Sequence, residues 1–195
     1  NPYFIAHEIT RSSDYDIVNG YLSAAYDFTP WLKLSLRSGL DSYSEKKEWK
    51  NPISASGGWD RKGYYCLQRL GGYSLNNDFM LSADHQLGDF NIDGFIGGTV
   101  YYWKSDNIMG ETQNGLTIPG SIDNVKTTSG VTKKLVNSLY GKVSASWKST
   151  VFVDITGRND WSSTLPKETR SYFYPSVAGS VVLSQFVPMP EVFDF

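Results

Sequence analysis

The chain has 195 residues, a length that suits one domain or part of one. Its 18 Lys and Arg residues and 20 Asp and Glu residues give a net charge of -2, so electrostatics gives no reason to expect nucleic acid as a partner. With 15% aromatic residues and 18 Gly, the composition favours strands and turns and argues against a helical bundle.

The first predicted strands form a hairpin. Residues 18–28 alternate between apolar and polar side chains, which is the period of a strand with one apolar face. Thr29-Pro30-Trp31 interrupts this pattern, and residues 32–44 repeat it. We therefore predict two antiparallel strands joined by a very short turn.

Two further hairpins follow the same rule. Residues 75–87 and 90–102 alternate on either side of Gly88-Asp89, which predicts a tight turn between two strands. Residues 139–147 and 151–155 alternate on either side of a three-residue link. The predicted links of the three hairpins are Thr29-Pro30-Trp31, Gly88-Asp89 and Lys148-Ser149-Thr150. We expect all three at one end of the sheet.

Long polar segments without sustained periodicity separate the hairpins and are predicted to be loops. The predicted loops are residues 45–72, 105–136 and 160–170. Residues 172–184 are predicted to form a seventh strand, and residues 1–4 are interpreted as loop. No stretch reaches 18 consecutive apolar residues, which argues against a membrane-spanning helix but not against a transmembrane β-barrel.

The alternation of short turns with long loops is typical of outer-membrane barrels, which have short periplasmic turns and long extracellular loops. The predicted strands, of about 11 to 15 residues, are also long enough to cross a bilayer when tilted. We therefore predict an all-β fold, an antiparallel transmembrane β-barrel segment of about seven strands. Because bacterial barrels have an even number of strands, and at least eight, the chain is expected to be part of a larger barrel.

The charged residues of the strands fall in the polar register, where a water-filled lumen would hydrate them. The residues expected to line the lumen are Arg37, Asp84, Lys142, Asp154 and Arg158. Aromatic residues beside the short turns are expected to form a girdle at the periplasmic interface. They are Phe28, Trp31, Phe90, Trp147 and Phe152. A soluble antiparallel sheet with one wetted face would show the same alternation.

One long run resembles a known family. The segment VDITGRNDWSSTLPKE at residues 153–168, continued by RSYFYPSV at 170–177, is similar to the barrel region of SusC/RagA-type TonB-dependent transporters. Supporting stretches are NPYF at 1–4, YDFTPWL at 26–32 and DFMLSA at 78–83. The resemblance follows the order and spacing of these segments along nearly the whole chain.

The resemblance implies a 22-stranded barrel in the bacterial outer membrane that encloses an N-terminal plug and is capped by a SusD-like surface lipoprotein. It also implies uptake of oligosaccharides or peptides driven by the TonB complex. Residues 1–195 would then be a partial barrel domain, in contact with outer-membrane lipid, without the plug, the TonB box, the signal peptide or the closing strand.

Five aromatic residues and one aspartate of the predicted loops are candidates for contact with substrate or lid, because buried aromatic side chains anchor many such contacts and a carboxylate can accept hydrogen bonds from sugar hydroxyls. These candidates are Trp49, Trp59, Tyr64, Tyr65, Asp160 and Trp161. For Asp160 and Trp161 the alternative is that they brace their own loop. We expect no cofactor and no metal, because His7, His85 and the single Cys66 stand in no ligand pattern.

Two other classes of function stay open. A soluble β-sandwich could bind carbohydrate through Trp49, Trp59 and Trp161, provided that a compact core closes within the chain. An enzyme is disfavoured, because no nucleophile, acid and base stand in a recognisable catalytic arrangement.

Overall fold

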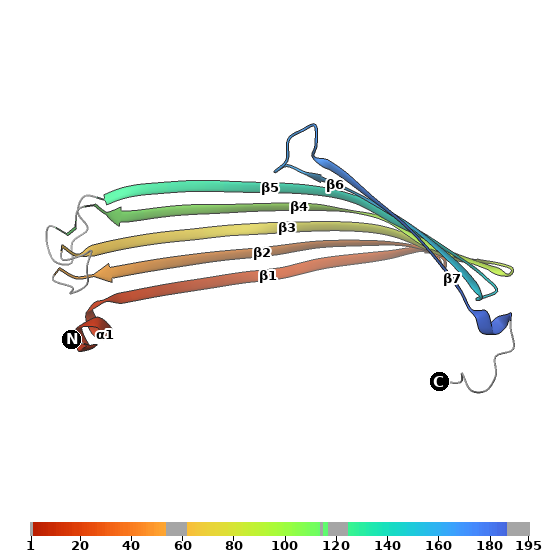
Figure 1. Ribbon diagram of the computed structural model, residues 1–195, viewed down its shortest axis with the longest axis horizontal. Helices are drawn as coiled ribbons and strands as arrows, with labels where there is room; N and C mark the ends of the chain where they lie inside the picture. The colour runs from red at the N-terminus through yellow and green to blue at the C-terminus, as the bar shows by residue number, and fades with distance from the viewer. Residues whose placement is uncertain (1, 54–61, 114, 117–124, 187–195) are drawn as a thin grey trace. The chain divides into compact units, whose positions relative to one another are not determined.

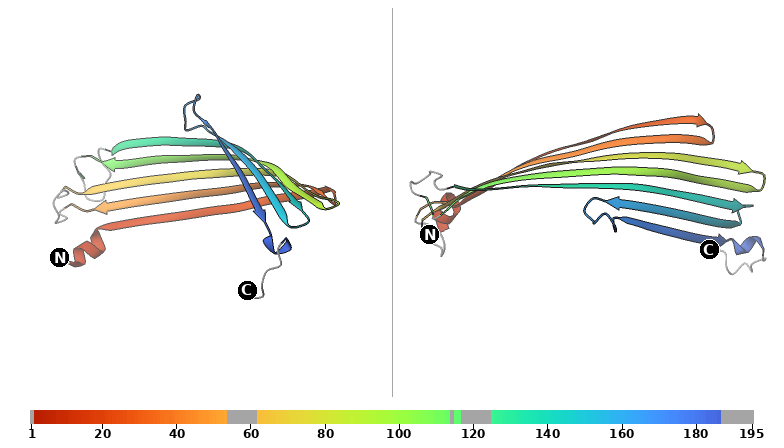
Figure 2. Two further views of the ribbon diagram at one scale, coloured as in Figure 1. Left: turned by 45° about the vertical axis from the view of Figure 1, so that its right-hand side comes forward. Right: turned by 90° about the horizontal axis from the view of Figure 1, so that it is seen from above.

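The computed structural model describes residues 2–53, 62–113, 115–116 and 125–186 (Figure 1). Seven strands form one antiparallel sheet in which neighbours in the chain are neighbours in the sheet. The elements are α1 (Pro2–Glu8), β1 (Thr10–Thr29), β2 (Leu32–Asn51), β3 (Tyr64–Leu87), β4 (Phe90–Thr112), β5 (Val125–Trp147), β6 (Val151–Ser162), β7 (Ser171–Val181) and the 3-10 helix η1 (Leu183–Gln185). The further views in Figure 2 show the same order of strands. Within the described residues, no helix is both long and apolar enough to span a membrane.

The number and order of strands are confirmed, but the predicted loop bounds are wrong. β2 continues to Asn51 and β3 begins at Tyr64, so most of the predicted loop 45–72 is strand. β4 and β5 likewise extend into the predicted loop 105–136. Strand pairing depends on backbone hydrogen bonds and needs no apolar face, so polar residues on both faces hid these extensions.

The ends of the outer strands also differ from the prediction. Residues 2–8, interpreted in part as loop, form α1, and β1 begins at Thr10 rather than at residue 18. β6 runs to Ser162, so Asp160 and Trp161 belong to a strand and not to a loop. β7 ends at Val181 and is followed by η1.

The chain divides into two compact units, and each strand from β1 to β5 contributes to both. Unit 1 comprises residues 1–20, 40–75 and 103–133, and unit 2 comprises residues 21–39, 76–102 and 134–195. Unit 2 contains the three predicted turns. The amide of Lys148 donates to the carbonyl of Asp89 at 2.8 Å, and the amide of Asp84 donates to the carbonyl of Trp31 at 3.0 Å. These bonds confirm that the turns lie at one end of this unit.

The register of β5, β6 and β7 separates two faces in unit 2. Lys142 lies opposite Thr156, and Asp154 lies opposite Ser144 on β5 and Ala178 on β7. We call this side, with Tyr140 and Arg158, the polar face. The other side, which we call the apolar face, contains Leu139, Val143, Trp147, Val153, Ile155, Phe173 and Val177. Phe152 pairs with Ser146 and Ser180, so it lies on the polar face and its assignment to the girdle is wrong.

The described residues form a single layer with almost no core. Cys66 is their one buried hydrophobic residue, whereas side chains such as Leu22, Ile96 and Val177 are exposed. A sandwich would bury the facing sides of two sheets, which a single sheet does not do. The interpretation as a soluble β-sandwich is therefore wrong for the described residues.

Candidate functional site

The polar face of unit 2 carries an ion pair between β5 and β6. Lys142 Nζ lies 3.1 Å from Asp154 Oδ1, and Ser144 Oγ donates to the same oxygen at 2.6 Å. The ordinary pairing of the two strands makes these contacts, because Ser144 lies opposite Asp154 and Lys142 is two residues away on the same face of β5. Two residues predicted to line a lumen, Lys142 and Asp154, are thus in direct contact.

A second cluster on this face centres on Arg158. Its Nε lies 3.0 Å from Asp160 Oδ1, its Nη2 donates to Ser138 Oγ at 3.1 Å, and its guanidinium carbon lies 5.3 Å from the centre of the Tyr140 ring. Asp160 therefore binds a residue predicted to line the lumen. Trp161 lies on the opposite face, because neighbouring residues of a strand point to opposite sides.

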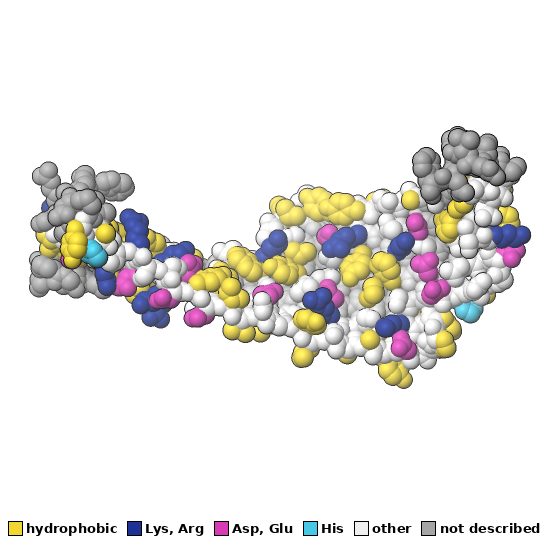
Figure 3. Space-filling model, turned by 90° about the horizontal axis from the view of Figure 1, so that it is seen from below, with side chains coloured by type: hydrophobic (Ala, Val, Ile, Leu, Met, Phe, Trp, Pro, Cys, Tyr) yellow, Lys and Arg dark blue, Asp and Glu magenta, His cyan; other side chains and the backbone are white. Residues whose placement is uncertain are grey.

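The polar face continues on β1 to β4 with mostly partnered charges. Lys33 Nζ lies 3.9 Å from Asp27, and the guanidinium of Arg37 lies 4.6 Å from the centre of the Tyr21 ring. Asp78 accepts hydrogen bonds from Thr99 at 2.7 Å and from Asn76 at 3.0 Å; the exposed Asp84 is on β3 as well. The face seen in Figure 3 shows Lys and Arg side chains interspersed with Asp and Glu.

Close packing of backbone and aromatic rings marks the middle of unit 2. A Cβ atom at Gly98 would lie 2.6 Å from the Phe79 ring, and one at Gly97 would lie 2.9 Å from the Tyr140 ring. The contacts with Phe79 on the apolar side and Tyr140 on the polar side extend the two faces to β3 and β4. By this alternation, Phe79 and Asp78 belong to opposite faces.

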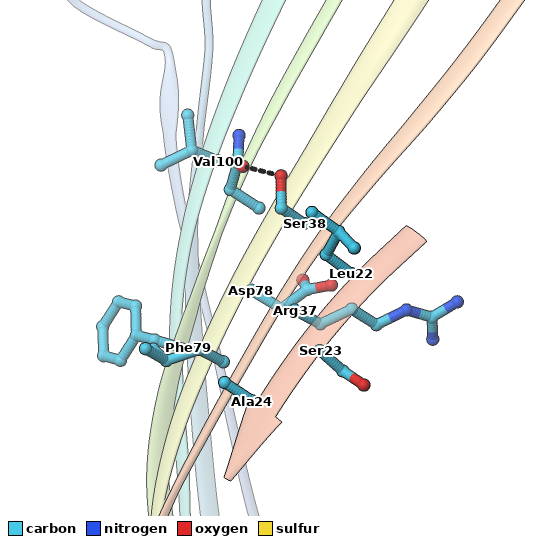
Figure 4. A pocket seen from close by; sticks show the side chains of 10 residues that line it. Leu22, Ser23, Ala24, Arg37, Ser38, Asp78, Phe79 and Val100 are labelled. Atoms are coloured by element: carbon cyan, nitrogen blue, oxygen red, sulfur yellow. Dashed lines mark hydrogen bonds between the residues drawn. The ribbon is translucent and has the colours of Figure 1, made fainter. Parts of the chain in front are cut away.

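The apolar face holds a shallow groove of about 450 Å³ (Figure 4). Leu22, Leu36, Phe79 and Val100 line it, and Figure 4 shows Arg37 and Phe79 pointing in opposite directions. Ser38 Oγ donates to Asn77 Oδ1 at 2.7 Å inside this groove. The hydrogen bond pairs two polar side chains on a face that is otherwise aliphatic and aromatic.

The apolar register has a defined length on each strand. Aromatic residues occupy it beside the turns, at Phe28, Phe90 and Trp147, and again farther along β3 and β4, at Tyr73 and Tyr102. Apolar side chains dominate between these ends. On each strand, counting from its turn, one residue is the first Asp, Glu, Lys or Arg in this register. From β1 to β5 these residues are, in order, Asp16, Lys46, Arg69, Lys104 and Lys133. All five positions lie in unit 1.

In unit 1 the candidate residues Tyr64 and Tyr65 are adjacent on β3 and lie on opposite faces. The Tyr64 hydroxyl donates to Glu111 Oε2 at 3.1 Å, and the Tyr65 hydroxyl donates to Glu48 Oε1 at 2.5 Å. Burial raises the pKa of Tyr65 to about 12, with a smaller effect of the hydrogen bond to Glu48. That hydrogen bond in turn lowers the pKa of Glu48. Trp49 lies in β2, and Trp59 lies outside the described residues.

A clasp holds the bases of the two connections of unit 1 together. The amide of Leu116 donates to the carbonyl of Lys62 at 2.8 Å, and the amide of Tyr65 donates to Thr112 Oγ1 at 3.1 Å. Gly115 has φ +91°, and a Cβ there would lie 2.3 Å from the Cβ of Lys62. Only glycine fits this close approach without strain.

An aromatic cluster that the sequence analysis missed lies on the polar side of unit 1. The rings of Tyr15 and Tyr43 stack with their centres 6.1 Å apart, and the Tyr43 hydroxyl lies 3.0 Å from Ser105 Oγ. A Cβ at Gly72 would lie 2.8 Å from the Tyr43 ring. If the period of two of the predicted strand 32–44 had been continued into the predicted loop 45–72, it would have placed Glu45 on the same face as Tyr43.

Comparison with known proteins supports the fold. No protein-family model matches the chain, and no curated protein matches it. The structure of the RagAB peptide transporter is similar, with a TM-score of 0.83 and 17% identity over 97% of this chain. The RagAB peptide importer in its open-open state gives the same TM-score and identity. The ferric preacinetobactin receptor BauA from Acinetobacter baumannii has a TM-score of 0.54 and 16% identity over 87% of this chain.

These likenesses confirm the predicted fold, an antiparallel sheet that matches part of the RagAB structure closely and part of the BauA structure less closely. The chain spans 22% of the RagAB chain and 28% of the BauA chain.

Proposed function

We propose that this chain forms seven adjacent strands in the wall of an outer-membrane, TonB-dependent nutrient importer of the SusC/RagA type, and has no enzymatic role. The likeness to RagAB supports the barrel architecture. The polar face would line the lumen, with Arg37, Asp84, Lys142, Asp154 and Arg158 among its residues. The apolar face would contact lipid.

The exposed apolar face is the observation that carries this proposal. Large side chains such as Leu22 (81% exposed) and Val177 (74% exposed) have no covering layer among the described residues. In water, so large an apolar surface would drive association. In a bilayer the same surface is satisfied, and the free edges of β1 and β7 would pair with further strands of a closed barrel.

The proposed substrates are oligosaccharides or peptides, and the proposed partners are a SusD-like surface lipoprotein and the TonB complex, the latter through a segment outside these residues. The similar RagAB structures are a peptide transporter and importer, which supports this assignment. Trp49, Trp59, Tyr64 and Tyr65 belong to β2, β3 or the connection between them. They are the proposed contacts with lid or substrate.

Uptake by cells tests the proposal. The full-length protein would be expressed in cells with and without TonB, and the uptake of labelled peptides and oligosaccharides would be compared. We expect uptake of one class that depends on TonB, and a folded band whose electrophoretic mobility changes on heating. Uptake that is the same without TonB, or a protein absent from the outer membrane, would contradict the proposal.

The proposed contact residues have a separate test. Trp49→Ala combined with Trp59→Ala is expected to weaken lipoprotein binding, because loss of an aromatic anchor typically costs about 2 kcal/mol at a hot spot. Asp84→Ala combined with Lys142→Ala serves as the control and should leave lipoprotein binding unchanged. Wild-type pull-down and uptake in the double Trp variant would show that neither side chain contributes to lipoprotein binding or uptake.

A further inference from the structure

Four cations occupy corresponding positions on neighbouring strands of unit 1. On each of β2 to β5, the first residue of the apolar register that carries a full charge is basic. We call these four residues the basic row: Lys46, Arg69, Lys104 and Lys133. On the edge strand β1 the corresponding residue is Asp16.

Contacts in unit 1 show that the row shares one face of the sheet. Glu48 hydrogen-bonds Tyr65, so even-numbered residues of β2 and odd-numbered residues of β3 lie on the same side. Lys46 and Arg69 follow this alternation. On the next pair of strands, a Cβ at Gly110 would lie 3.3 Å from Val125 Cγ1, which places Lys104 and Lys133 on one side in the same way.

Contacts in unit 1 also show where the residues of the row lie along their strands, with Lys104 opposite a point three residues from Arg69. Ser42 Oγ donates to the carbonyl of Gly72 at 3.3 Å, and the Tyr65 hydroxyl donates to Glu48. Lys46 and Arg69 both lie between these two hydrogen bonds, which link β2 to β3. The carbonyl oxygen of Lys104 faces Gly72, where a Cβ would lie 2.7 Å from it.

The acidic residues near the row are largely engaged. Lys104 Nζ lies 3.0 Å from Asp106, and Glu48 is held by Lys50 at 3.2 Å as well as by Tyr65. Lys46, Arg69 and Lys133 are exposed. Positive charge therefore remains available at Lys46, Arg69 and Lys133, whereas Asp14 and Asp16 lie on β1, the edge strand beside β2.

We propose that the basic row binds the phosphate groups of lipid headgroups at the outer surface of the bilayer. This inference rests on the proposed function, which places the apolar register in lipid. Basic residues that follow an apolar band and interfacial tyrosines such as Tyr73 and Tyr102 match the charge of phosphorylated headgroups. The occupant is a lipid and not a free anion, because the row continues a register that is apolar toward the turns.

Adjacent lysines provide a matched test. Lys46 and Lys133 belong to the row, whereas their sequence neighbours Lys47 and Lys134 point to the opposite face. The full-length polypeptide that contains this chain would be reconstituted in phosphatidylcholine nanodiscs, without and with lipid A. Native mass spectrometry would follow bound lipid A across a titration.

We expect Lys46→Gln combined with Lys133→Gln to weaken lipid A binding roughly thirtyfold, since each basic residue near an anionic surface contributes about fivefold. Lys47→Gln combined with Lys134→Gln should leave binding within twofold of wild type, at about the scatter of such measurements. Inorganic phosphate should not compete.

Each contrary result has a distinct meaning. Equal loss in both double variants, or no loss in either, would overturn the inference while leaving the transporter proposal intact. Competition by inorganic phosphate would show a free-anion site and overturn the lipid assignment. A protein that fails to enter even pure phosphatidylcholine nanodiscs would overturn the membrane placement, and with it both proposals.

Discussion

Replacing Val143 with arginine distinguishes a lipid-facing sheet from a water-facing one. Val143 lies opposite Ile155 on the apolar face, and the two side chains are 56% and 54% exposed. If water covered this face, the substitution would change the free energy of unfolding by no more than about 1 kcal/mol. At the middle of a bilayer the same change costs about 2 to 4 kcal/mol.

The position of Val143 along β5 supports the larger value. At about 3.3 Å per residue, the distance along β5 from Trp147, the expected girdle residue beside the turn, to Val143 is about 13 Å. A strand tilted by about 40° converts this to about 10 Å of depth, close to the centre of an apolar band about 25 Å tall.

Urea unfolding of the full-length protein in lipid vesicles would measure the effect. Ser176→Arg is the control, because Ser176 is exposed on the polar face opposite Thr156. We expect Val143→Arg to lower the free energy of unfolding by about 2 kcal/mol or more and Ser176→Arg by less than about 1 kcal/mol. Equal, small effects would show that water covers the apolar face and would refute the assignment.

Three further predictions concern unit 1 and the isolated chain. Gly115→Ala should destabilise the clasp by about 1 to 3 kcal/mol, which would appear as faster hydrogen exchange at the Leu116 amide. Gly130→Ala is the control and should not change this exchange, because a Cβ at Gly130 meets only open space. Unchanged exchange in Gly115→Ala would contradict the clasp. The pKa of Tyr65, raised from 10.0 to about 12, favours the protonated phenol in the fold, so its stabilisation is complete below pH 10 and is lost as pH rises toward 12. Tyr65→Phe should remove that part of the alkaline loss in unfolding curves measured against pH, and an identical pH profile would contradict it. The 195-residue chain expressed alone should self-associate in detergent-free buffer, and a monodisperse monomer with a cooperative melt would disprove this.

The alternation of side chains was enough to predict strand number and order where one face is apolar. The hairpin around Gly88-Asp89 has its predicted turn, and its longer strands contain the two predicted ones, because Phe79, Leu81 and Ile96 repeat with a period of two. The turn residues Gly88 and Asp89 predicted where β3 ends and where β4 begins.

The strand extensions had no such signal. Residues such as Ser13 and Glu45 hydrogen-bond across β1 and β2 at 2.8 Å, and Gln68 and Asn107 do so across β3 and β4 at 3.0 Å. Polar pairs of this kind stabilise a ladder without producing any contrast of hydrophobicity between its faces. Composition therefore predicts loop where the backbone is strand.

For the candidate site, the sequence predicts which residues share a face of the sheet but not which of them are in contact. Lys142 and Asp154 share the polar register in sequence, but their pairing depends on the alignment of β5 with β6, which is set by the turn at Lys148 and Ser149. Both turn residues have φ 51°, a conformation that neither residue type favours. No simple propensity rule indicates this turn.

If the polar face lines the lumen of the proposed importer, the pairing of its charges determines the electrostatic potential that a passing solute would meet. Lys33, Lys142 and Arg158 are each close to an aspartate, at 3.9, 3.1 and 3.0 Å. A matched pair produces a short-range dipole, whose potential falls off much faster than that of a single charge. A conduit lined in this way would discriminate weakly by the sign of a solute's charge and more strongly by its size and hydrogen-bonding groups. Measured permeation through such a wall would accordingly change little with ionic strength.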